Sequence, residues 1–160
     1  MIITFAGHST VFSCEQVKEA VKEQIKNNIS SNEKTVFYLG GYGEFDSICA
    51  CACRELKKEY SCMEVVYITP YISLSEQKKI KQMQDEGLCD TSLYPPLENV
   101  PPKFAILKRN EWMIEKADFV ISYIEHNYGG AYNTFKTAVR KNKKMINIFD
   151  LLNDDLKEDI

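Results

Sequence analysis

The sequence contains no long apolar run and no excess of positive charge. No stretch approaches the ~18 apolar residues that a membrane-spanning helix requires. The 23 Asp and Glu residues outnumber the 20 Lys and Arg residues, which gives a net charge of −3. The basic clusters at Lys78–Lys79 and Arg140–Lys144 lie on predicted polar helix faces or helix ends, where they are solvated. We therefore expect neither a membrane nor a nucleic acid as a partner.

Histidine is scarce, with two residues, and the six cysteines do not form a metal-binding pattern. Cys49 and Cys53 have helical i, i+4 spacing, but no second Cys or His pair complements them at metal-site spacing. We interpret them as small apolar core residues and expect neither a metal nor a cofactor. The start of the chain, Met1–Phe5, lacks the basic region of a signal peptide and has the pattern of a strand. Cysteines without an export signal predict a cytoplasmic protein.

Short apolar strands alternate with amphipathic helices along the chain, and no hairpin signal separates them. This order predicts a doubly wound α/β domain over residues 1–150, with about five mainly parallel strands and helices on both faces. Residues 151–160 form an acidic C-terminal tail. Residues 88–102, which hold four of the five prolines, form either a structured loop or a lid over a pocket. Capping boxes begin the helices at Ser13 and Ser73. The predicted strands are 2–6, 35–39, 64–69, 119–124 and 145–149.

Three of the predicted strands run directly into glycine and then into a helix. The turns are Gly7-His8-Ser9-Thr10, Gly40-Gly41-Tyr42-Gly43-Glu44 and Tyr128-Gly129-Gly130-Ala131. Glycine lets the backbone approach a ligand closely, and a helix N-terminus offers unpaired N–H groups. Right-handed crossovers place all three turns at one edge of the sheet, which predicts a pocket for phosphate or another anion. The alternative is that the glycines only let each helix pack tightly on its strand.

Other polar and aromatic residues are candidates for the same edge. Arg109, followed by Asn110, is either a planar fork for phosphate or part of a surface salt bridge. Asp46 either accepts a hydrogen bond from a ribose hydroxyl or caps its helix. His8 and Ser9 are placed to contact phosphate, whereas a Ser–His–acid triad with His126 lacks a nucleophile-elbow pattern. Four tyrosines either stack on a base or provide half-buried packing: Tyr71, Tyr94, Tyr128 and Tyr132.

Several of these stretches resemble the signature of the SLOG superfamily. Arg109-Asn110-Glu111-Trp112-Met113, then Ala117-Asp118, then Gly129-Gly130-Ala131-Tyr132-Asn133-Thr134 resembles its second half. Gly7-His8-Ser9 and Gly40-Gly41 with Phe45-Asp46 resemble the first half, and the whole is most similar to YpsA-like members. The resemblance implies a Rossmann-like domain that binds a nucleotide-derived ligand. The ligand-binding candidates are Gly7, His8, Ser9, Gly40, Gly41, Gly43, Asp46, Arg109, Asn110, Gly129, Gly130, Ala131, Asn133 and Thr134.

Tyr128 and Lys136 depart from the pattern of the LOG-type phosphoribohydrolases of this superfamily, and Tyr128 stands where that pattern has proline. Their pattern Pro-Gly-Gly-x-Gly-Thr-x-x-Glu ends in a glutamate that helps cleave an N-glycosidic bond, and Lys136 occupies that position here. A cation there removes general acid/base capacity and stabilisation of positive charge. We therefore favour a protein that senses or sequesters a nucleotide-derived small molecule, such as an ADP-ribose-type or cyclic nucleotide signal, with phage anti-defence as one such role.

Two further expectations remain open at this point. The alternative function is an N-glycosidase, phosphoribohydrolase or nucleoside-transferring enzyme acting on nucleoside monophosphates or NAD-like substrates, with Glu44, Asp46 or Glu125 as its carboxylate. The resemblance also implies a homodimer or higher homo-oligomer. The helix over 103–116 supports this, because its apolar positions exceed the needs of one face: Phe104, Ile106, Leu107, Trp112, Met113 and Ile114.

Overall fold

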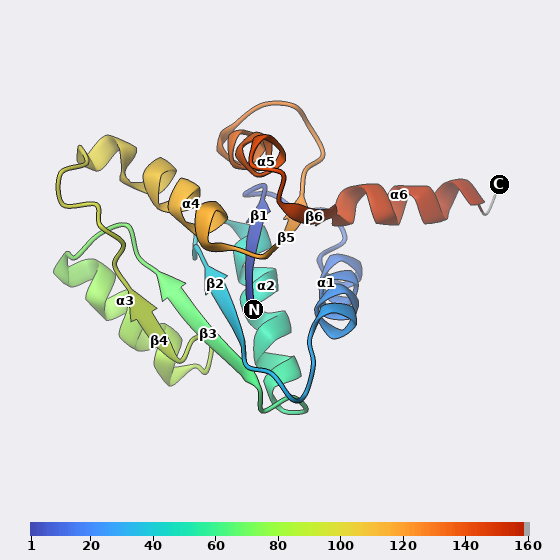
Figure 1. Cartoon of the computed structure of the whole chain (residues 1–160), viewed down its shortest axis with the longest axis horizontal. Coiled ribbons are helices and arrows are strands. Elements are labelled where there is room, and N and C mark those ends of the chain that lie inside the picture. Colours follow the sequence, from blue (N-terminus) through green and yellow to red (C-terminus); the bar gives the residue numbers. More distant parts are fainter. Residues whose placement is uncertain (159–160) are drawn as a thin grey trace.

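Parallel strands form a sheet between two layers of helices (Figure 1). The computed structural model describes residues 1–158, with the backbone alone described for 155–158. Within these residues the sheet has six strands in the order β4-β3-β2-β1-β5-β6, and every neighbouring pair is parallel. The strands are β1 (Ile2–Gly7), β2 (Thr35–Leu39), β3 (Met63–Ile68), β4 (Thr91–Leu93), β5 (Phe119–Tyr123) and β6 (Lys144–Asn147).

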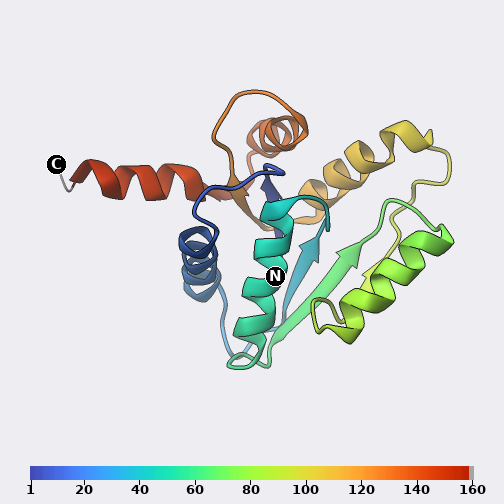
Figure 2. The same ribbon diagram turned by 180° about the vertical axis from the view of Figure 1, so that it is seen from behind.

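The helices cover both faces of the sheet, as expected of a doubly wound fold. Figure 2 shows α1, α2 and α3 in front of the sheet, with α4 and α5 behind it. The start of α6 packs against α1 and β5. The predicted α/β fold is thereby confirmed. The helices are α1 (Cys14–Asn28), α2 (Glu44–Lys57), α3 (Leu74–Asp85), α4 (Ala105–Lys116), α5 (Gly130–Arg140) and α6 (Ile148–Glu158), and a short 3₁₀ turn (Pro102–Phe104) precedes α4.

The apolar periodicity of the sequence accounts for the larger core. Val17, Val21 and Ile25 of α1 are fully buried against the sheet. The apolar stripe of α2 is buried from Phe45 to Leu56 and includes Cys49 and Cys53, the cysteines predicted to lie in the core. Burial raises the pKa of the Cys53 thiol, as expected of a core residue.

Three local features differ from the sequence-based expectations. The region 88–102 contains the short strand β4, whose three residues are all exposed and therefore carry no apolar signal. Ser13 precedes α1 in a left-handed conformation (φ 58°), so its hydroxyl makes no capping bond, whereas Ser73 is extended and accepts from Glu76 N at 3.3 Å. Strand β6 ends at Asn147, and α6 follows at once. The expected acidic tail lies within α6 up to Glu158, and 159–160 lie outside the described residues.

The surface of α4 is partly apolar. Met113 and Ile114 are buried, but Phe104 and Leu107 are 44% and 40% exposed. The expected homo-oligomer stays a prediction. Among the described residues, no helix is long and apolar enough to cross a membrane.

A buried arginine connects α4 to the ends of two strands. The Arg109 side chain is 1% exposed. Its Nη1 donates to the carbonyl oxygen of Gly40, just after β2, at 2.6 Å and to that of Ile68, the last residue of β3, at 2.7 Å. Its Nε donates to Asn110 Oδ1 at 2.8 Å. The guanidinium therefore satisfies two carbonyls that the sheet leaves unpaired.

We predict that Arg109→Met lowers the free energy of unfolding by roughly 2–4 kcal/mol, because both buried carbonyls lose their donor. Lys116→Met, an exposed change on the same helix, should alter it by about 0.5 kcal/mol or less. Urea denaturation at neutral pH measures both. A loss below about 1 kcal/mol for Arg109→Met would contradict the structural role.

Candidate functional site

A cavity of about 600 Å³ lies at the carboxyl ends of the strands. The cavity lies beside the neighbouring strands β1 and β5. From β1 the chain continues to β2 on one side, and from β5 it continues to β6 on the other side. Doubly wound sheets bind their ligands at such a position. The structure brings most of the predicted site residues to it. Those that line the cavity are Gly7, His8, Ser9, Gly40, Asp46, Arg109, Asn110, Glu125, Gly129, Gly130, Ala131 and Thr134. Those outside its lining are Gly41, Gly43, Glu44 and Asn133.

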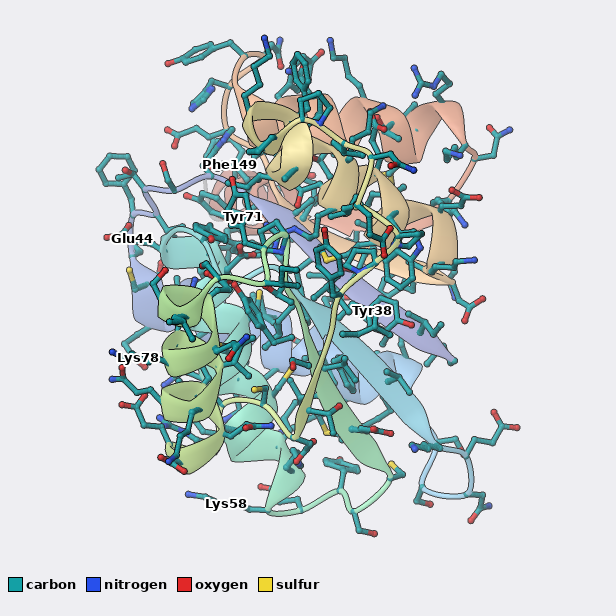
Figure 3. All side chains as sticks on the ribbon, turned by 90° about the vertical axis from the view of Figure 1, so that its left-hand side faces the viewer. Tyr38, Glu44, Lys58, Tyr71, Lys78 and Phe149 are labelled. Atoms are coloured by element: carbon teal, nitrogen blue, oxygen red, sulfur yellow. The ribbon has the colours of Figure 1, made fainter. Side chains whose placement is uncertain are left out.

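The turn after β2 is filled by the protein itself. A Cβ on Gly43 would lie 2.8 Å from the Ser9 Cα, and a Cβ on Gly41 would lie 2.3 Å from the Tyr67 ring. The Glu44 carboxylate accepts from Val11 N at 2.6 Å. Figure 3 shows Glu44 at the start of α2, beside the connection that follows β1. These residues hold two turns together and do not face the cavity.

The turn after β5 has the same backbone but faces open space. Gly43 and Gly129 each precede a helix with φ 92°, and their ψ angles are 171° and 177°. A Cβ on Gly129 or Gly130 would meet nothing within 4 Å. Because the first N–H groups of a helix have no intrahelical partner, the start of α5 presents free donors to the cavity. This turn is the one suited to an anion.

Arg109 and Asp46 form the floor of the cavity. Two of the three guanidinium nitrogens of Arg109 are used by the protein, so the predicted phosphate fork is at most partly available. The Asp46 carboxylate accepts from Tyr42 N at 2.9 Å. Burial raises the pKa of Asp46 to about 6, against the opposing effects of that hydrogen bond and of Arg109 and Lys79. An acid with this pKa changes charge near neutral pH.

The basic pair Lys78–Lys79 is only partly solvated. Lys78 is exposed on the outer side of α3 (Figure 3). Lys79 Nζ is half-buried, donates to Gly41 O at 2.8 Å and lies 3.9 Å from the centre of the Tyr42 ring. Burial lowers the pKa of Lys79. The expectation of a solvated pair was therefore wrong for Lys79, which supports the turn after β2.

Stacked rings form one wall of the cavity. The ring centres of His8 and His126 are 3.7 Å apart, and those of His126 and Tyr128 are 3.8 Å apart. His8 Nε2 accepts from the backbone N of Glu125 at 3.0 Å, which fixes the neutral tautomer with its proton on Nδ1. Because Nε2 is occupied, His8 cannot act there as a base for Ser9. Burial, and then His126, lower the pKa of His8, and Glu125 acts in the opposite direction.

Sequence reasoning missed several lining residues and misplaced others. Tyr42 lines the cavity and had a signal in the sequence, because it stands inside a glycine-rich turn. The other missed lining residues are apolar and had no such signal: Phe5, Ala6, Phe12, Ile106 and Met113. Of the four candidate stacking tyrosines, Tyr128 lines the cavity and the other three do not. Lys136 also lies outside the lining, 5.0 Å from the centre of the Tyr132 ring. Among residues 1–154, no group of three His, Cys, Asp or Glu side chains could hold a metal ion.

Comparison of the sequence with known protein families assigns the chain to a family. A sequence model described as the YspA SLOG family (YpsA) matches residues 8–156. The chain belongs to this SLOG family. No curated protein matches it in sequence.

Two solved structures share the fold of this SLOG protein. DNA processing protein A (DprA) from Streptococcus pneumoniae is 16% identical with a TM-score of 0.60, over 89% of this chain and 48% of that one. The chain thus spans about half of that protein. DNA processing protein A from Helicobacter pylori, which has a single-stranded DNA binding mode, is 17% identical with a TM-score of 0.59, over 99% of this chain and 81% of that one.

The expectation that nucleic acid is not a partner is corrected by this likeness, since a protein with the same fold binds single-stranded DNA. The expectation rested on the net negative charge and on the lack of a basic stripe in the sequence. Between Lys103 and Lys144, a segment that includes α4 and α5, nine Lys and Arg residues stand against four Asp and Glu. The rest of the chain carries 11 Lys and Arg residues against 19 Asp and Glu residues. The positive excess therefore lies in one segment of the sequence, whose Lys143 and Lys144 lie at the amino ends of β5 and β6 and not at the cavity.

We predict that Gly43→Ala is more destabilising than Gly129→Ala, although both residues have the same φ. Each substitution incurs backbone strain of roughly 1–3 kcal/mol. Only at residue 43 does the new Cβ also press on the Ser9 backbone, which should add about 1–3 kcal/mol. Thermal and urea unfolding of both variants measure the difference. Equal losses would show that the turn after β2 is not tightly packed.

We predict that Asp46→Asn stabilises the protein at pH 7.5. The raised pKa means that the folded state binds the Asp46 proton more tightly than the unfolded state, so this residue favours folding at low pH, and the benefit is lost as pH rises from about 4 to 6. Asparagine keeps an acceptor for Tyr42 N without the charge. The gain should be roughly 1–3 kcal/mol at pH 7.5 and vanish at about pH 4. Urea unfolding at both pH values is the measurement, and destabilisation at pH 7.5 would contradict the argument.

Proposed function

We propose that the cavity binds a nucleotide-derived small molecule with its phosphate at the start of α5. The observation that carries the proposal is the open turn at Gly129 and Gly130, which precedes a helix of 11 residues at the ligand position of the sheet. The stacked rings and Phe12 supply an aromatic wall for a base. Membership of the SLOG family is consistent with nucleotide-related binding.

Binding without chemistry is the form of this function that we favour. Lys136 stands at the position of the LOG-type glutamate and lies outside the cavity lining. Sensing or sequestering an ADP-ribose-type or cyclic nucleotide, including a phage anti-defence role, requires only a well-formed site. The volume of about 600 Å³ lies in the usual range of small-molecule sites.

The enzymatic alternative depends on two carboxylates. Glu44 is used by the backbone of Val11, so Asp46 and Glu125 are the candidates that line the cavity. Asp46, with a pKa of about 6, has the acidity expected of a general acid/base group near neutral pH. Cleavage of an N-glycosidic bond would therefore be abolished by Asp46→Asn.

A nucleotide unit of single-stranded nucleic acid is the second candidate ligand. The aromatic wall, on which a base can stack, and the likeness in fold to a protein with a single-stranded DNA binding mode support this candidate. Such binding should weaken steeply as salt concentration rises.

We predict that at least one of AMP, ADP-ribose, NAD, cyclic AMP and a short oligo(dA) stabilises the protein. At a hundredfold excess over Kd the gain is ~2.7 kcal/mol. This corresponds to a melting-temperature rise of roughly 5–10 °C. The variant Gly130→Ala should fold normally, because its Cβ meets nothing within 4 Å, yet lose at least about tenfold in affinity by placing a methyl group in the phosphate position.

The matched control is Val139→Ala, an exposed change on the same helix that should leave binding unchanged. Absence of any thermal shift at millimolar ligand would reject the proposed function. Chromatography of the same incubations reports free base. Release of base that disappears in Asp46→Asn and Glu125→Gln would replace the binding-only interpretation with the enzymatic one.

A further inference from the structure

The column of His8, His126 and Tyr128 is not explained by core packing. The planes of adjacent rings differ by 10° and 19°, so the three rings lie nearly parallel with His126 in the middle. The inner ring, His8, is 7% exposed, whereas Tyr128 at the outer end is 69% exposed. A ring with that exposure gains little from burial. One face of Tyr128 is therefore stacked, and most of the remaining ring is open to solvent.

The column stands on a loop that is fixed by hydrogen bonds. His8 Nε2 accepts from the backbone N of Glu125 at 3.0 Å and of His126 at 3.4 Å. One residue earlier, the Asn147 side chain accepts from Ile124 N at 2.9 Å and donates to Ile124 O at 3.0 Å. Three consecutive residues before Tyr128 are thus held by side chains from β6 and from the turn after β1. A fixed platform loses little conformational entropy when a ligand binds.

The middle ring is held by its two stacking neighbours. The buried Nδ1 atom of His126 makes no hydrogen bond within the described part of the chain. His8 is neutral because its Nε2 accepts hydrogen bonds, and burial lowers the pKa of His8 further. A column of nearly parallel rings presents a flat π surface that suits another aromatic ring.

We propose that the open face of Tyr128 is the stacking platform for the nucleobase of the ligand and that it makes the site prefer purine over pyrimidine nucleotides. This inference rests on the proposed function. Tyr128 directly precedes Gly129, so base and phosphate are recognised by adjoining residues of one loop. A purine covers more of the ring than a pyrimidine, and stacking of one base on an aromatic side chain changes affinity by about 5- to 100-fold.

A free nucleotide and a base in a single strand would stack on Tyr128 in the same way. The experiment therefore measures Kd by calorimetry for AMP, UMP, ribose 5-phosphate and a short oligo(dA). The variants are Tyr128→Ala and Tyr128→Phe. Tyr132→Ala is the control, since Tyr132 stacks on Phe135 and does not line the cavity.

In the native protein AMP should bind about 3- to 10-fold more tightly than UMP. Tyr128→Ala should lower the affinity for AMP by about 5- to 100-fold and bring the ratio of the AMP and UMP affinities close to one. The affinity for ribose 5-phosphate should stay unchanged. Tyr128→Phe should behave as the native protein, because the Tyr128 hydroxyl makes no hydrogen bond to the described residues. If oligo(dA) competes with AMP and binds more tightly than AMP, the base belongs to a single strand. If oligo(dA) binds more weakly than AMP, the base belongs to a free nucleotide.

Two outcomes would overturn the platform while leaving the proposed function in place. One is an unchanged AMP-to-UMP ratio in a Tyr128→Ala variant whose melting temperature shows that it is folded. The other is an equal loss of affinity for AMP and ribose 5-phosphate, which would mean that the ring only supports the loop. Failure of the native protein to bind any of the four probes would reject the platform and the proposed function together.

Discussion

The guanidinium of Arg109 connects α4 to the carboxyl ends of β2 and β3 at the point where the cavity forms. A parallel sheet leaves carbonyls unpaired at its carboxyl edge, and helix α4 supplies a donor to two of them, on Gly40 and Ile68. Unpaired buried carbonyls are costly, so the ends of β2 and β3 cannot shift independently of α4. The positions of Asp46 and Tyr42, which follow Gly40 in the chain, depend on this link. The arginine is therefore better understood as the support of the site than as its main ligand group.

The glycine turns divide between support and recognition for a steric reason. Gly43 and Gly129 have nearly identical backbone angles, and each precedes a helix. They differ in what surrounds them, because Ser9 packs against Gly43 whereas nothing lies within 4 Å of a Cβ on Gly129. A glycine-rich turn after a strand thus indicates a tight approach without specifying its partner. At Gly43 the partner is the protein itself, and at Gly129 space is left for a ligand.

The sequence was sufficient for the architecture and for the location of the cavity. Apolar strands that alternate with amphipathic helices leave few arrangements other than a doubly wound sheet, and that arrangement brings the strand ends together. Strand β4 escaped prediction because its exposed residues, Thr91 to Leu93, lack an apolar pattern. The burial of Arg109 and the filling of the turn at Gly43 depend on neighbours more than 30 residues away, which no local pattern reports.

The net charge of the chain does not report the charge beside the cavity. Long-range attraction of an anionic ligand depends on the charges near the site, because screening limits each charge to about 10 Å at ordinary salt. The acidic residues that make the net charge negative belong mainly to segments outside Lys103–Lys144, while that segment carries the positive excess and includes the open start of α5. Lys143 and Lys144 of that segment lie at the amino ends of β5 and β6, whereas Gly129 lies at the carboxyl ends, so only part of the positive excess acts at the cavity. Discrimination between a free nucleotide and a single strand must therefore come from the shape and the rings of the cavity.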